Sequence, residues 1–89
     1  MGVLVESYVA SSASRAAADR LIREALDGSP VGGVRFLGSM FIPGDATAFF
    51  LFDRGEPAAI RAVMERAGIT VDRLVEADAD NALSWSQEV

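Results

Sequence analysis

Two neighbouring apolar runs around a short turn dominate the pattern of this 89-residue chain. They cover residues 34–42 and 46–52, and Pro43-Gly44-Asp45 lies between them. Apolar runs on both sides of a Pro-Gly turn predict a β-hairpin. A strand with one solvated face alternates apolar and polar residues, but residues 49–52 read Phe-Phe-Leu-Phe without a break. We therefore expect both faces of the hairpin to be covered.

The segment before the hairpin predicts a strand and then a helix. Residues 3–10 are rich in valine and predict the first strand. The serines within residues 11–14 offer a side-chain oxygen to an unpaired helix N–H, so a helix should begin there and end at Gly28-Ser29-Pro30. The apolar stripe of this helix is formed at helical spacing by Ala18, Leu21, Ile22 and Ala25.

The segment after the hairpin predicts a second helix and a last strand. Pro57 suits a first helical turn, because its missing N–H costs nothing there and its φ angle is already suitable. Gly68 is a candidate C-cap for this helix, and residues 71–77 predict the last strand. The stripe of the second helix is formed by Ile60, Val63, Met64 and Ala67.

The order of elements, βαββαβ, predicts an α+β, ferredoxin-like fold. In this fold two helices cover one face of a four-stranded antiparallel sheet, with the first and third strands at its centre. We expect a single domain over residues 1–80, followed by a C-terminal tail at residues 81–89.

The sheet face without helices predicts self-association. Soluble monomers rarely expose an apolar patch of that size, so we expect a homodimer that joins the open sheet faces in a dimeric α/β-barrel-like arrangement. The residues that the sequence assigns in part to this face are Leu4, Glu6, Tyr8, Leu37, Phe41, Phe49 or Phe50, Leu51 and Leu74.

Composition and charge narrow the class of partner. Hydrophobic residues make up 51% of the chain, which is typical of a globular protein. A net charge of −5 argues against nucleic acid and membrane surfaces as partners, since both attract positive charge. The absence of cysteine, of a leader pattern and of an apolar run of about 20 residues makes the cytoplasm the expected location.

Parts of the chain also resemble a family of small bacterial proteins of uncharacterised function. The resemblance covers residues 34–77 and implies a ferredoxin-like fold and a dimer; the family includes a nickel-binding streptomycete protein. Its members often carry cysteine, histidine or another polar residue in the third strand, where this chain has Ala48 and Phe50. The resemblance rests on residues 34–45, 49–52, 59–61, 65–69 and 71–77.

We do not extend metal binding to this chain. Nickel and zinc favour imidazole or thiolate ligands, and the chain has neither histidine nor cysteine. Asp78-Ala-Asp80 begins like a calcium loop with Asp72 and Glu76 nearby, but Ala82 stands where a third oxygen ligand is needed. We expect a solvated strand end there, and no cofactor.

No nucleophile motif is present, and the chain has no lysine, so we assign no catalytic residue. Polar and aromatic residues of the sheet are candidates for contacting a ligand. A glutamate among Phe and Leu side chains could act as an acid or base, but a glutamate that simply pairs with an arginine would look the same in sequence. The candidate ligand-binding residues are Glu6, Tyr8, Arg35, Phe41, Phe50 and Glu76.

Two functions remain open at this point. The preferred one is a non-catalytic, dimeric protein that binds a small apolar ligand or serves only for interaction. The alternative is a cofactor-independent enzyme that resembles dimeric α/β-barrel monooxygenases or polyketide cyclases. Only analogy of fold supports the enzyme, because this architecture is host to many unrelated activities.

Overall fold

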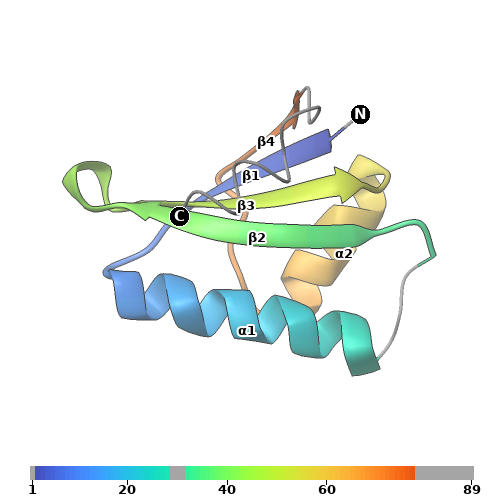
Figure 1. The fold of residues 1–89 in the computed structure, drawn as a ribbon, viewed down its shortest axis with the longest axis horizontal. Coiled ribbons are helices and arrows are strands. Elements are labelled where there is room, and N and C mark those ends of the chain that lie inside the picture. Colours follow the sequence, from blue (N-terminus) through green and yellow to red (C-terminus); the bar gives the residue numbers. More distant parts are fainter. Residues whose placement is uncertain (1, 29–31, 78–89) are drawn as a thin grey trace.

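The computed structural model describes residues 2–28 and 32–77. Its elements follow one another in the predicted βαββαβ order, with one turn of 3-10 helix inside the hairpin (Figure 1). Their bounds are β1 Gly2–Tyr8, α1 Ser12–Gly28, β2 Arg35–Ile42, η1 Pro43–Asp45, β3 Thr47–Arg54, α2 Pro57–Arg66 and β4 Arg73–Ala77. The first and last strands are therefore shorter than the sequence predicts.

The four strands form one antiparallel sheet in the order β2-β3-β1-β4. Both helices lie on the same side of it, and no described element covers the other side (Figure 1). Strands β1 and β3 are central, and β2 and β4 are the edges, as predicted. The protein therefore has the ferredoxin-like α+β fold.

The helix ends confirm two capping predictions. Helix α1 begins directly after Ser11, whose Oγ accepts a hydrogen bond of 3.1 Å from the backbone N–H of Ser14. Helix α2 ends in a Schellman motif: Gly68 has φ +76° and donates to Glu65 O, and Ile69 donates to Met64 O.

The core lies between the sheet and the helices. Phe50 and Phe52 of β3 are fully buried there, and the rings of Phe36 and Phe52 are 5.1 Å apart. In the predicted stripe of α2, Ile60, Val63 and Met64 are buried and Ala67 is partly buried. Leu21 of α1 was assigned wrongly, because its side chain is 43% exposed. The buried core consists of Val3, Val5, Ala18, Ile22, Ala48, Phe50, Phe52, Ile60, Val63 and Met64.

The strand register divides the apolar run of β3 between two faces. Phe50 lies opposite Val5 and points toward the helices, whereas Phe49 lies opposite Glu6 and points away from them. The hairpin therefore supplies apolar side chains to both faces, as predicted. We call the side away from the helices the open face; by register it carries Leu4, Glu6, Tyr8, Met40, Ile42, Thr47, Phe49, Leu51, Arg73 and Val75.

Within residues 2–28 and 32–77, neither helix has the length and apolar character that a membrane span needs. The predicted domain limit at residue 80, the tail at residues 81–89, and the acidic pair Asp78 and Asp80 lie outside the described residues.

Candidate functional site

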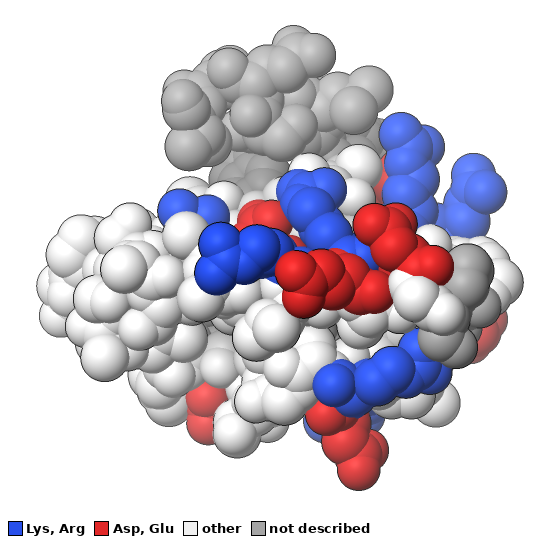
Figure 2. Space-filling model, turned by 90° about the horizontal axis from the view of Figure 1, so that it is seen from below, with Lys and Arg blue, Asp and Glu red and all other residues white. Residues whose placement is uncertain are grey.

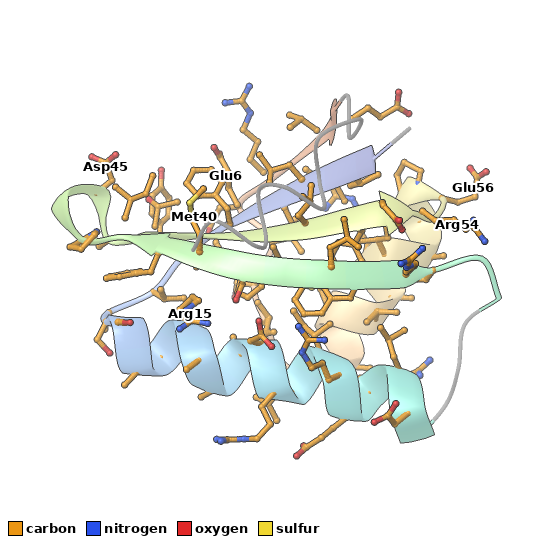
Figure 3. All side chains as sticks on the ribbon, viewed as in Figure 1. Glu6, Arg15, Met40, Asp45, Arg54 and Glu56 are labelled. Atoms are coloured by element: carbon orange, nitrogen blue, oxygen red, sulfur yellow. The ribbon has the colours of Figure 1, made fainter. Side chains whose placement is uncertain are left out.

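Glu6 and Tyr8 lie on the open face of β1, where the sequence placed them. Glu6 is half-buried, and Tyr8, the last residue of β1, is 71% exposed. Figure 3 shows Glu6 and Met40 on the side of the sheet that faces away from α1. The two candidates that the sequence placed on β1 thus share one surface.

Three other candidates were placed on the wrong face. Phe50 is fully buried in the core, and Phe41 lies opposite Ala48, which also points toward the helices. Glu76 lies opposite the buried Val3 and is therefore on the helix side too. In these strands, the odd-numbered and the even-numbered positions both include apolar residues. The sequence pattern alone therefore did not decide which of the two sets of side chains faces the helices.

Arg35 lies at the other end of the sheet from Tyr8. It begins β2 and is paired in register with Arg54, whereas Tyr8 is paired with Thr47 at the far end of β3. Its Nη1 atom is 3.3 Å from Oδ2 of Asp53. The structure therefore separates Arg35 from the Glu6 and Tyr8 pair.

A hollow of about 360 Å³ lies on the open face near the end of β1. Glu6 and Tyr8 come from β1, Thr47 and Phe49 from β3, and Asp45 from the η1 turn. Thr47 lies opposite Tyr8 and Phe49 opposite Glu6, so antiparallel pairing brings these four side chains to one place. This hollow is the candidate functional site.

The sequence did not single out Asp45 or Thr47 as site residues, because both belong to the hairpin turn and its exit. Thr47 Oγ1 donates a hydrogen bond of 2.9 Å to the backbone oxygen of Asp45. Ala46 between them adopts the left-handed conformation with φ 47°, and its N–H bonds to Pro43 O. A Thr two residues after an Asp in a tight turn is the sequence signal that could have indicated that both residues line the hollow.

Asp72, which precedes β4, holds the backbone of Tyr8 beside the hollow. Its carboxylate accepts a hydrogen bond of 2.8 Å from the backbone N–H of Tyr8, and its own N–H donates to Glu6 O at 3.0 Å. These two bonds continue the pairing of β1 beyond the last residue pair of β4. The backbone that carries Tyr8 is therefore held in place at its end.

The charge of Glu6 is balanced across the strand. Its Oε2 atom lies 4.0 Å from Nη1 of Arg73, the residue opposite it on β4. The Arg73 side chain is 67% exposed, and a pair this long and this solvated contributes little to stability. This is the cross-strand pairing that the sequence left open beside a role as acid or base.

A second, larger hollow lies at the opposite end of the sheet, where β3 ends and α2 begins. It measures about 730 Å³, and its side-chain charges come from Asp53, Arg54, Glu56 and Glu76. In Figure 3 Arg54 and Glu56 lie at this end, far from Glu6 and Asp45. No aromatic side chain is among its described lining residues, so an apolar ligand would find little surface there.

The acidic side chains of the described residues form no cluster of three. Within residues 2–28 and 32–77, no three Asp or Glu side chains are grouped closely enough to hold a metal ion. The candidate site offers hydroxyl, phenol and carboxylate groups beside an aromatic ring, which suits binding or proton transfer to an organic molecule.

Comparison with known proteins gives a likeness of fold. No family model matches the chain, and no curated protein matches it. The structure is similar to that of SCO4226 from Streptomyces coelicolor A3(2), with a TM-score of 0.71 and 19% sequence identity over 86% of this chain and 95% of that one. At this identity the likeness concerns the fold alone, and it assigns no metal and no activity. The chain thus shares its architecture with a small bacterial protein.

Proposed function

We propose that this protein is a homodimer whose two subunits contact each other through their open faces. Each subunit binds a small organic ligand in the hollow beside Glu6 and Tyr8. The observation that carries the proposal is the composition of the open face. The ten residues that the register assigns to this face are mostly apolar, and the two charged ones among them, Glu6 and Arg73, lie opposite each other. A second copy is the occupant that such a face fits, because an isologous contact pairs one patch with itself.

Exposure on the open face supports this proposal. Tyr8 is 71% and Ile42 is 37% exposed, and these are two of the three large apolar side chains that are exposed in the described part of the chain. Burial of such side chains between two subunits stabilises association by about 25 cal/mol for each Å² of apolar surface removed from water. A chain of this size gains more from such burial than a large domain does.

The dimer is tested by placing a charge on the open face. In light scattering we expect the 89-residue protein to have twice the 9.4 kDa chain mass and the Ile42→Lys variant to have the mass of one chain, because an ammonium group is costly to desolvate in an interface. Leu21→Lys is the matched control, since Leu21 is similarly exposed but lies on α1. Equal masses for the two variants would count against the open face as the interface.

The ligand is tested by native mass spectrometry of protein purified from its own host. We expect a dimer that carries an additional non-covalent mass. A bare dimer would leave only the interaction role. A bare monomer would contradict the whole proposal.

One arrangement favours the cofactor-independent enzyme as a second candidate. Glu6 and Tyr8 line the same hollow, so a carboxylate and a phenol could both reach a bound molecule. In that case the copurified ligand should turn over, and Glu6→Gln and Tyr8→Phe should each lower the rate while binding is retained. Binding without turnover would favour the non-catalytic role.

A further inference from the structure

The hollow on the open face combines aromatic surface with negative charge. Tyr8 and Phe49 line it with two rings, and Glu6 and Asp45 line it with two carboxylates. Among the described residues the Asp45 carboxylate makes no ion pair, and no arginine lines the hollow. This differs from the wholly apolar lining that a neutral apolar ligand prefers.

We infer that the ligand of this hollow is a small organic cation, an alkylammonium group with an apolar body, held between the rings of Tyr8 and Phe49 and the carboxylates of Glu6 and Asp45. The inference rests on the proposed function and specifies the ligand class of the same site. An aromatic face attracts a cation through its quadrupole, and a nearby carboxylate adds direct attraction. A cation also matches the net charge of −5 of the whole chain.

The walls of the hollow suit such a ligand. Thr47 is 7% exposed and its hydroxyl already donates to Asp45 O, so this residue presents little unsatisfied polar surface to the ligand. Glu6 is held 4.0 Å from Arg73, a distance at which its oxygens remain available to a second cation. A volume of about 360 Å³ accommodates a compact ligand of this kind.

A pair of isosteric probes separates charge from shape. Choline carries a trimethylammonium group, and 3,3-dimethyl-1-butanol carries a tert-butyl group of nearly the same size without the charge. We expect the 89-residue protein to bind choline about 3- to 30-fold more tightly than the neutral alcohol, as measured by amide chemical shifts. Added salt should weaken the binding of choline alone.

Variants that remove one charged side chain test whether the carboxylates attract choline. Asp45→Asn and Glu6→Gln should each weaken choline binding several-fold, and Arg73→Gln should strengthen it, because Arg73 competes for Glu6. The affinity for the neutral alcohol should not change in any of them. Glu65→Gln and Arg61→Gln are the controls, since both are exposed residues of α2, on the other side of the sheet.

The outcomes separate this inference from the proposed function. If the neutral alcohol binds as tightly as choline, the inference that the ligand is a cation is wrong, whereas the proposed ligand site remains. If neither probe binds, the cation assignment is overturned even where the dimer forms. If choline binds to a protein that stays monomeric, the inference stands and the proposed dimer does not.

Discussion

Ser39 on β2 donates a hydrogen bond of 2.5 Å to Oδ2 of Asp19 on α1. The same serine oxygen accepts a bond of 3.1 Å from Arg15, and Asp19 also accepts a 2.7 Å bond from Arg23. Figure 3 shows Arg15 between α1 and the sheet, and Figure 2 shows arginines beside acidic residues on the helix side. A polar serine within an apolar edge strand therefore fastens the first helix to it.

Removal of this hydroxyl should destabilise the protein measurably. We expect Ser39→Ala to lower the free energy of unfolding by about 1 to 2 kcal/mol, since hydrogen bonds to charged partners are stronger than neutral ones. Urea denaturation monitored by circular dichroism measures it. Ser12→Ala, at an exposed serine of α1, is the matched control and should change stability little. Equal midpoints for the two variants would show that the network carries no stability.

Gly68 is required for its backbone conformation alone. It has φ +76°, and an added Cβ would meet no atom within 4 Å, so a substitution there costs backbone strain and no clash. We expect Gly68→Ala to lower the free energy of unfolding by about 1 to 2 kcal/mol. Gly44→Ala is the control. Gly44 is not among the glycines with positive φ, so the free energy of unfolding of this variant should stay the same or rise. A neutral result at Gly68 would place the helix end elsewhere.

Adjacent phenylalanines on β3 should behave differently, because they point to opposite faces. We expect Phe50→Ala to cost about 3 to 5 kcal/mol as a cavity in the core, and Phe50→Asp to prevent folding. Phe49→Ala should cost clearly less stability and should instead reduce ligand binding, since Phe49 lines the hollow. Thermal melting measures the stability of both alanine variants, and choline binding followed by amide chemical shifts measures the ligand affinity. A similar loss from both would contradict the register.

Local signals predicted the elements well. The serine cap within residues 11–14, the glycine at Gly68 and the apolar spacing of α2 each depend on residues a few positions apart, and each is confirmed. The element order then determined the ferredoxin-like arrangement, because few topologies accommodate it.

The faces of the strands could not be predicted in the same way. Register shifts between Arg35 and Gly38 put Phe36 and Ser39 on the same face, although they are an odd number of residues apart. Such a bulge depends on pairing with a distant strand, and an apolar run gives no local sign of it. Phe41 was therefore placed wrongly. Asp45 lines the hollow because of the conformation of the hairpin turn, which the sequence pattern did not predict.

Asp72 should control how firmly Tyr8 is held at the site. Its carboxylate accepts the Tyr8 N–H at 2.8 Å, and this N–H would lose its acceptor in Asp72→Ala, whereas Asp72→Asn keeps a side-chain oxygen at the same position. We expect amide hydrogen exchange of Tyr8 to become about 3- to 10-fold faster in Asp72→Ala, equivalent to about 1 kcal/mol, and to change little in Asp72→Asn. The amide of Val5, within the β1 pairing to β3 and β4, is the internal reference. Faster exchange at Val5 as well would indicate general loosening of the sheet, and unchanged exchange at Tyr8 would mean that Asp72 does not hold the end of β1.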